Sequence, residues 1–311
     1  MKLTPRAYRD EEDYWRIRQF LREVLLLNER HEWSWPVARL DYWRWHGVEN
    51  LEHLRLEEVV FLWETLNGQL AAVVNPEGKG EAHLQVDPRL RTPELEEEML
   101  AVAEGHLASP DSEGRLKLCV WATDRDDLRR DILARRGYAK SGWPEHLRRR
   151  TLAEPILEAL PPPGYAVRAL GEGAELLERC YASGLAFHEG DIQIAADNRA
   201  DVSWYRNIQN APLYRRDLDI VVIASDGAVV SFCTIWFDDV TRTAHFEPVG
   251  TVPAHQRRGL ARAALCEGLH RLKRSGATMA YVGGYSPAAN ALYASVGFAE
   301  YGLREPWVKA F

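Results

Sequence analysis

The residues best suited to chemistry in this 311-residue chain lie between His245 and Arg262, where a strand-like stretch runs into a loop and then a helix start. A helix N-terminus presents unpaired N–H groups and about half a positive charge, which suits a phosphate or pyrophosphate. Gly259 permits close approach to the backbone, and Ala261 is small enough for the helix to begin against a ligand. Positive charge is added by Arg257, Arg258 and Arg262. The simpler alternative is a strand–turn–helix with solvated arginines.

Pro248 and Gly250 interrupt the strand that leads into this loop. Neither residue suits a central, fully paired strand, because proline has no N–H to donate and glycine weakens the strand. The pair predicts a bulge or a splayed edge that leaves backbone amides free to bond a ligand.

A second string lies downstream at Ser286-x-x-Ala289-x-x-Leu292-Tyr293-x-x-x-Gly297-Phe298. Together with Gln256-x-x-Gly259-x-Ala261 it resembles the GNAT superfamily of N-acetyltransferases, except that Ser286 replaces the usual asparagine. The resemblance covers Gly164–Phe311 in its coarse element order and implies a fold that binds acetyl-CoA as acyl donor.

The resemblance also implies roles for individual positions. Tyr293 stands where the family commonly places the acid that protonates the departing thiolate, and we favour this role over the alternative of a core aromatic on an amphipathic helix. The pantetheine arm would face the backbone of Val249, Gly250 and Thr251. The remaining cofactor-binding positions, mostly around the pyrophosphate, would be Gln256, Arg257, Arg258, Gly259, Leu260, Ala261, Arg262 and Ser286.

An acceptor amine needs a base, because an ammonium of pKa about 10.4 is rarely deprotonated at pH 7. Glu247 and His245 are two residues apart on one strand and so share a face. Glu247 is our first choice, since a carboxylate in an apolar strand must find a partner or a raised pKa. His245 is the second, with an ordinary pKa near neutrality. Alternatively, Glu247 positions the acceptor and bulk water takes the proton.

The acceptor side of the family fold corresponds to residues 187–191 and 204–214. Candidates to shape this pocket are His188, Glu189, Asp191, Trp204 and Tyr205.

The elements that must position these residues recur in two halves. Arg6 and Arg168 follow similar strand patterns 162 residues apart, and Gly137-Tyr138 and Gly297-Phe298 close similar helices 160 residues apart. We therefore predict two tandem GNAT-like α/β (α+β) domains, each a mixed, mostly antiparallel sheet flanked by helices. The predicted boundaries are 1–155, a proline-rich linker at 156–163, and 164–311.

The second half carries the clearest local signals. Its Asp226-Gly227 pair is typical of a hairpin turn. We predict strands at 220–224, 229–237, 243–252 and 280–283, and helices at 260–275 and 287–296, the last with Ser286 as N-cap.

The first half departs from the cofactor pattern. Its corresponding loop, 86–92, lacks glycine, and glutamates that would repel CoA follow at positions 94 and 96–98. Leu133 occupies the place of the tyrosine. We predict a catalytically silent half whose glutamates form a solvated helix face.

Composition excludes several other classes. The chain is 46% apolar and 27% charged with a net charge of −7, and its basic runs are short, so nucleic-acid and membrane binding are not expected. Four scattered cysteines and the histidine spacing indicate neither a disulfide framework nor a metal site. We predict a cytoplasmic N-acetyltransferase acting on a primary amine of a small molecule. A non-catalytic acyl-CoA-binding regulatory module and a protein N-acetyltransferase are the alternatives; oligomeric state is not indicated.

Overall fold

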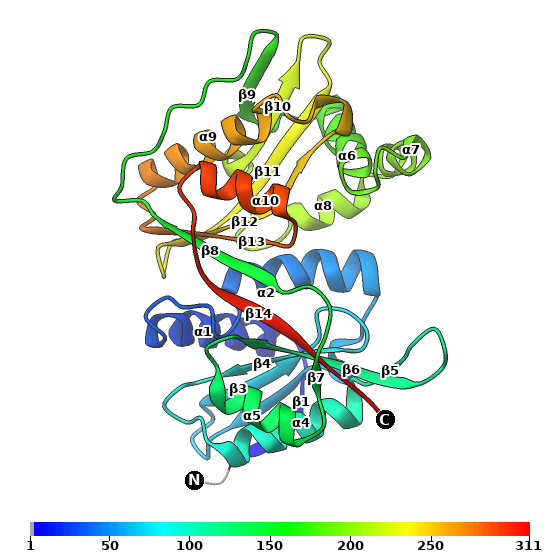
Figure 1. Cartoon of the computed structure of the whole chain (residues 1–311), viewed down its shortest axis with the longest axis vertical. Coiled ribbons are helices and arrows are strands. Elements are labelled where there is room, and N and C mark those ends of the chain that lie inside the picture. The colour runs from blue at the N-terminus through cyan, green and yellow to red at the C-terminus, as the bar shows by residue number, and fades with distance from the viewer. Residues whose placement is uncertain (1–2) are drawn as a thin grey trace. The chain divides into compact units, whose positions relative to one another are not determined.

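The computed structural model describes residues 3–311 and divides the chain into two compact units (Figure 1). One unit contains Met1–Glu145 with Gly302–Phe311, and the other contains His146–Tyr301. These limits differ from the predicted domains at 1–155 and 164–311, because the last ten residues belong to the first unit. Strand β14 (Ala299–Ala310), red in Figure 1, pairs antiparallel with β6 (Leu116–Thr123).

The first unit is a sheet between two layers of helices. Its strands run in the order β1 (Thr4–Ala7), β2 (Phe61–Glu64), β3 (Leu70–Asn75), β4 (Glu81–Val86), β6 and β14, with β4 and β6 parallel. Short strands β5 (Ser109–Pro110) and β7 (Ala139–Lys140) pair with β6 and β14. The helical segments are α1 (Glu11–Leu27), α2 (Val37–Tyr42), a π-helix at Trp43–Glu52, α3 (Leu56–Val59), α4 (Pro93–His106) and α5 (Asp127–Arg135). One apolar core packs α4 and α5 on the sheet, and a separate core packs α1 and α2.

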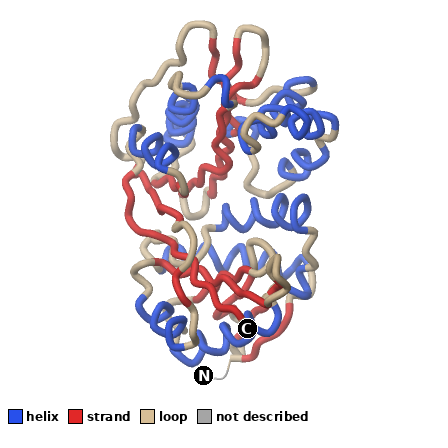
Figure 2. Tube along the Cα trace, turned by 45° about the vertical axis from the view of Figure 1, so that its right-hand side comes forward, coloured by secondary structure: helices blue, strands red, loops and turns tan. Residues whose placement is uncertain are grey.

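The second unit repeats this plan. Its strands run in the order β9 (Tyr165–Ala169), β10 (Asp219–Ala224), β11 (Val229–Asp238), β12 (Thr243–Thr251), β13 (Met279–Gly284) and β8 (Glu145–Thr151). Its helices are α6 (Ala174–Phe187), α7 (Ile192–Ala200), α8 (Ser203–Gln209), α9 (Leu260–Arg274) and α10 (Pro287–Ser295), with short 3₁₀ turns at Arg216–Leu218 and Pro253–His255. Figure 2 shows the alternation of strand and helix along the tube. The mixed, mostly antiparallel sheet flanked by helices is as predicted.

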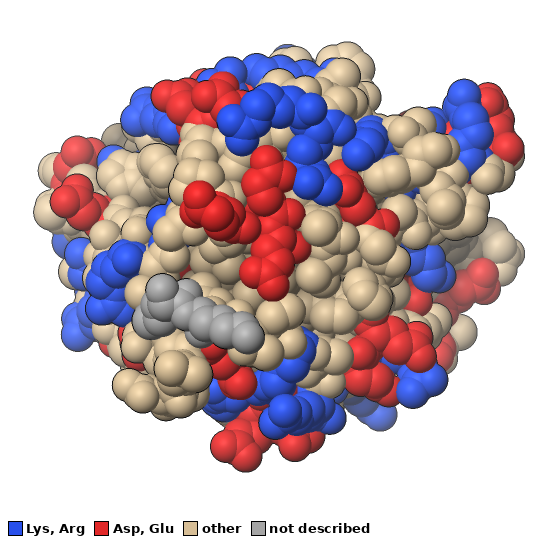
Figure 3. Space-filling view, turned by 90° about the horizontal axis from the view of Figure 1, so that it is seen from below, with Lys and Arg blue, Asp and Glu red and all other residues tan. Residues whose placement is uncertain are grey.

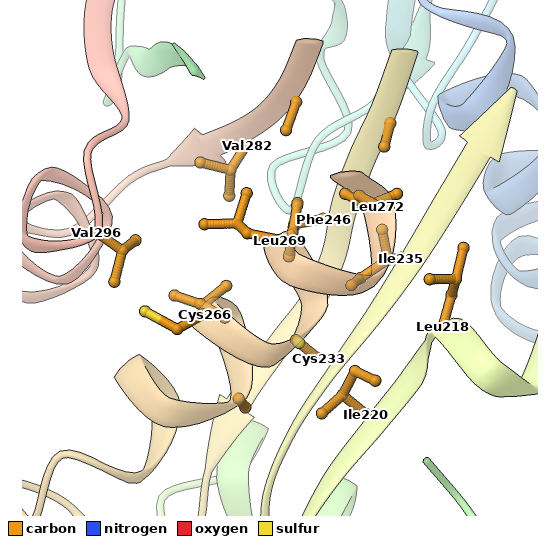
Figure 4. Packing of buried hydrophobic residues seen from close by; sticks show 14 of the residues in the cluster. Leu218, Ile220, Cys233, Ile235, Phe246, Cys266, Leu269, Leu272, Val282 and Val296 are labelled. Carbon is orange, nitrogen blue, oxygen red and sulfur yellow. The ribbon is translucent and has the colours of Figure 1, made fainter. Parts of the chain in front are cut away.

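The core of the second unit holds α9 against the sheet (Figure 4). Leu265, Leu269 and Leu272 lie at helical spacing and are fully buried, as the sequence predicted. Side chains of α9 pack among strand residues in the close-up, including Cys266, Leu269 and Leu272 with Cys233, Ile235 and Phe246. This packing fixes where α9 begins relative to the end of β12.

The sheet opens beside β12. Strands β12 and β13 pair in parallel only from Thr243–His245 to Met279–Tyr281, so β12 continues without that neighbour. Opposite β11, the register shifts between Cys233 and Ile235, which face Val249 and Phe246. Glu247 and Pro248 together face the single residue Thr234, which makes a bulge at this point. The predicted bulge and splayed edge are confirmed.

Two features concern the expectation that the chain binds neither nucleic acid nor membranes. On the face shown in Figure 3, acidic and basic side chains are interspersed. Every helix within residues 3–311 is too short or too polar to cross a bilayer.

Candidate active site

A cleft of about 310 Å³ lies where β12 leaves β13 and α9 begins. It brings together most of the residues that the two sequence strings predicted. The lining residues are Val249, Gly250, Thr251, His255, Gln256, Arg257, Gly259, Leu260, Ala261, Arg262, Ala288, Ala289, Leu292 and Tyr293. Ala289 and Leu292 belonged to the second string, whereas no sequence signal identified His255 or Ala288 as lining residues.

Some backbone N–H groups of β12 point away from β11, toward the cleft. Val252 N donates to Val230 O of the β11 hairpin at 3.0 Å. N–H groups alternate in direction along an antiparallel strand, so those of Val249 and Thr251 point away from β11. On that side β13 no longer pairs. Two donors are therefore available to a ligand lying between the strands.

The start of α9 has the features of an anion-binding site. Gly259 is its N-cap with φ +80°, and no side chain caps the helix. A Cβ at Gly259 would meet open space, so the backbone is accessible there. Arg257 is held at φ +62°, a left-handed conformation uncommon outside glycine, and both it and Arg262 line the cleft. The helix start and these two arginines fit a pyrophosphate.

Two predicted cofactor residues have other roles. Arg258 lies outside the cleft lining, and its guanidinium donates to Tyr165 Oη at 3.0 Å and to the Ala254 carbonyl at 3.2 Å. Ser286 caps α10 by accepting the Ala289 N–H at 3.1 Å, as predicted from its position before the helix. Both residues shape the cleft walls from behind.

Gly250 is required by packing rather than by ligand approach. A Cβ at this position would lie 2.4 Å from Phe232 Cζ. The glycine therefore lets β12 pass over the Phe232 ring, which is fully buried. The sequence had indicated a residue that weakens the strand and whose backbone faces the pantetheine arm, and it gave no sign of the contact with Phe232.

Tyr293 lines the same cleft as Arg257 and Arg262. Its side chain is 6% exposed, and burial, followed by the nearby negative charge of Glu247, raises its pKa above the usual value for a phenol. The hydroxyl therefore stays protonated at neutral pH. A leaving thiolate is a weaker base than this phenolate, so transfer of the proton to sulfur would rely on the hydrogen bond that forms as the C–S bond breaks.

His245 and Glu247 point to one face of β12, as predicted. His245 Nε2 lies 3.4 Å from Glu247 Oε2, and His245 is buried whereas Glu247 is half-buried. The Glu247 carbonyl accepts a 2.6 Å hydrogen bond from Trp236 Nε1, which fixes the bulge. Neither His245 nor Glu247 is among the residues that line the cleft, and Glu247 lies in the bulge of β12 next to it.

The predicted acceptor residues lie in different environments in the structure. Asp191 caps α7 by accepting the N–H groups of Gln193 and Ile194 at 2.8 and 3.0 Å. Tyr205 is buried in a polar cluster rather than lining the cleft, with Trp204 against it edge-on. His188 and Glu189 are exposed in the turn after α6.

The first unit has a larger cleft, about 520 Å³, and three of its lining residues, Arg91, Asp126 and Arg129, are engaged in ion pairs. Thr92 caps α4 by accepting the Leu95 N–H at 3.2 Å. Glu96 is fully buried and binds Arg91 and Arg129, so the prediction of a solvated face is wrong for this glutamate. The burial of Glu96 follows from its position on the side of α4 that faces α5. Leu133 is buried in the core.

Within residues 3–311, one group of side chains has the types and proximity of metal ligands: Glu77, Glu81 and His83. Two of them already have protein partners. Arg39 Nη2 donates to Glu77 at 2.7 Å, and Trp35 Nε1 donates to His83 Nδ1 at 3.1 Å. The group therefore serves ion pairing and hydrogen bonding inside the first unit.

Solved structures with similar folds span the whole chain. A GCN5-related N-acetyltransferase from Sphaerobacter thermophilus is 18% identical, with 99% of this chain and 95% of that chain covered at a TM-score of 0.65. A tandem GNAT protein from the clavulanic acid biosynthesis pathway is 13% identical, with 99% and 98% covered at 0.67. A GNAT-family acetyltransferase from Colwellia psychrerythraea is 12% identical, with both chains fully covered at 0.60. The fold is thus that of a tandem GNAT protein.

Residues 171–298 match the model of the Acetyltransferase (GNAT) family, and no curated protein matches the chain by sequence. The match contains α6 to α10 and the cleft described above. The segment of the chain that holds the cleft is thus similar to the GNAT acetyltransferases.

Proposed function

We propose that the second unit transfers an acetyl group from acetyl-CoA directly to the primary amine of a small molecule, and that the first unit is catalytically silent. The observation that carries this proposal is one cleft lined by an uncapped helix start, two arginines and Tyr293. Acetyl-CoA supplies an activated acyl group whose phosphates suit the helix start and the arginines and whose thioester suits Tyr293.

The residues present would hold the donor in an extended pose. Arg257, Arg262 and the first amides of α9 would bind the pyrophosphate, and the free N–H groups of Val249 and Thr251 would bind the pantetheine arm and the thioester carbonyl. These groups lie on three connected segments whose geometry is fixed by the core.

Proton transfer would be divided between two side chains. Glu247, with His245 beside it, would accept the proton of the ammonium, either directly or through water. Tyr293 would donate its hydroxyl proton to the leaving sulfur. A protein that only binds acyl-CoA would need neither group in these places.

Two further features support the proposal. Helix α6 packs over β11 and β12 on the face that carries Glu247, and this cover favours a small acceptor over an extended peptide. All four cysteines are free, which supports action in the reducing cytoplasm.

The test is acetyl transfer measured as thiol release with acetyl-CoA and a panel of small amines and peptides. Y293F and E247Q should each lower kcat by about 10²–10⁴-fold while leaving the Kd for acetyl-CoA within about 3-fold. Y285F and E267Q are matched controls on exposed or partly exposed positions away from the cleft lining and should be active. Unchanged kcat in Y293F and E247Q would support a different mechanism, and release with peptides alone would support the protein-modifying alternative.

A further inference from the structure

Arg179 of α6 is a buried cation whose hydrogen bonds are incomplete. Its side chain is 0% exposed, and its guanidinium carbon lies 3.5 Å from the ring centre of Phe232. Nη2 is 3.5 Å from Thr234 Oγ1, and Nε is 4.0 Å from Asp219 Oδ1, beyond hydrogen-bond length. Nε and Nη1 have no hydrogen-bond acceptor among the residues described.

Asp219 does not complete the pair because other groups hold its carboxylate. It accepts hydrogen bonds from Tyr205 at 2.6 Å, Tyr214 at 2.9 Å and Thr234 at 3.2 Å. These three hydroxyls orient the carboxylate, and two donors of the guanidinium are left facing away from it. A buried charged donor without an acceptor is costly, so this arrangement calls for an explanation.

Two other buried arginines of the same chain each bind a carboxylate through two nitrogens. Arg129 binds Glu96 through Nε and Nη2 at 3.0 and 2.9 Å. Arg18 binds Asp41 through Nε and Nη2 at 2.8 and 3.0 Å. Each takes a two-pronged carboxylate, which is the partner that Arg179 lacks.

The first unit shows that the fold does not need charge at this place. Tyr8 N donates to Val60 O at 2.9 Å, and Leu170 N, 162 residues later, donates to Asp219 O at 2.7 Å. Asp219 thus takes the place of Val60, which lies in the apolar core beside α1.

The same offset relates the two first helices. Each begins with an ion pair back to the first strand, and the two pairs are Arg6–Asp13 and Arg168–Glu175. Arg179 then takes the place of Ile17, another member of that apolar core. The second unit has therefore replaced two core aliphatic residues by a buried cation and a buried carboxylate, at a cost in desolvation.

The cluster lies on the reacting face of the sheet. Thr234 is on β11 directly opposite the Glu247–Pro248 bulge, and Trp236, two residues on, pairs with His245 and bonds the Glu247 carbonyl. Facing residues of adjacent strands have Cβ atoms about 5 Å apart. The guanidinium thus contacts the residue of β11 that faces the Glu247–Pro248 bulge.

We propose that Arg179 binds a carboxylate of the acceptor, so that the acceptor is a small amino-acid-like molecule with its amine at Glu247. This inference rests on the proposed acetyl transfer and names its substrate class. The carboxylate would accept the Nη1 hydrogens, which have no acceptor among the residues described. Tyr214 is the partly exposed member of the cluster, so a route from the surface would pass its ring.

The experiment compares matched pairs that differ only in the carboxylate: L-phenylalanine with 2-phenylethylamine, L-lysine with cadaverine, and β-alanine with ethylamine. One arm measures kcat/KM for acetyl transfer, and a second measures binding of each compound without donor by calorimetry. The wild-type chain should prefer the carboxylate member of at least one pair by about 50-fold or more in both arms. R179M should reduce that preference to within about 3-fold, R179K should restore part of it, and R206M, which removes an exposed arginine of α8, should keep it.

Because R179M leaves Asp219 without a cation, R179M/D219N is the second variant and should behave like R179M. Acetyl-CoA affinity should be unchanged in all of them. Equal binding of both members of every pair by the wild-type chain, or a preference that survives in R179M/D219N, would overturn the proposal. Failure of acetyl transfer itself would appear separately, as no thiol release with any amine, and the binding arm would still decide the role of Arg179.

Discussion

Replacement of Gly259 by aspartate should separate ligand binding from folding. Gly259 has φ +80° and a Cβ there would meet nothing within 4 Å, so the substitution introduces backbone strain without a clash. The left-handed conformation costs a non-glycine residue roughly 1–2 kcal/mol. A carboxylate at the start of α9 interacts favourably with the helix dipole, which offsets about 0.5 kcal/mol of this strain. The net loss of stability is about 1 kcal/mol.

The effect on acetyl-CoA is larger. A carboxylate about 4 Å from a phosphate costs about 1 kcal/mol in bulk water and about 4 kcal/mol at the effective dielectric constant of a protein surface. One lost hydrogen bond to a charged group adds about 1.5–3 kcal/mol. A total near 3 kcal/mol raises the Kd by about 100-fold or more.

The assay pairs isothermal titration with thermal unfolding. Gly227 is the matched control, because it has φ +89° and open space at its Cβ but lies in the hairpin between β10 and β11. G259D and G227D should each lower Tm by about 2–4 °C. Only G259D should lose acetyl-CoA binding. A G259D protein that binds within 3-fold of wild type, or a G227D protein that loses binding equally, would refute the reasoning.

Two other predictions concern residues outside the cleft. D191A removes the α7 cap and should cost about 1 kcal/mol in chemical denaturation with no change in acetyl-CoA affinity; a change in affinity without a loss of stability would place Asp191 in the site instead. Burial lowers the pKa of His83 to about 4, so between pH 6.5 and 4 the unfolded chain takes up a proton that the folded chain does not. Stability of the first unit should fall by up to about 3 kcal/mol as pH falls through that window, and H83Q should flatten the dependence. An equally steep profile in H83Q would contradict the assignment.

Local patterns identified most of the second unit. Strands β10 to β13 and helices α9 and α10 lie within one or two residues of their predicted limits. Alternating or helical hydrophobic spacing and the Asp226-Gly227 turn act over a few residues, so they can be seen in sequence. The cleft could be predicted because the two sequence strings at 256–261 and 286–298 supply residues of its walls.

Long-range pairing was not visible in this way. The last strand, β14, joins β6 of the first unit across more than half of the chain, and nothing in its own composition identifies that partner. The proline-rich segment near Pro161 therefore predicted a boundary that the compact units do not follow.

Roles set by packing were also hidden. Gly250 is small because of Phe232, and Glu96 is buried because of Arg91 and Arg129, which lie at different distances in sequence. Tyr205 was predicted to shape the acceptor pocket, but its hydroxyl donates to the buried carboxylate of Asp219. Such contacts depend on the assembled sheet rather than on neighbouring residues.

The central claim is that one unit of the two binds the acyl donor. Calorimetric titration of the full chain with acetyl-CoA, read for stoichiometry, tests it most directly. We predict one site per chain. Two sites would contradict the silent first unit, and no binding at millimolar acetyl-CoA would contradict the assignment of the cleft.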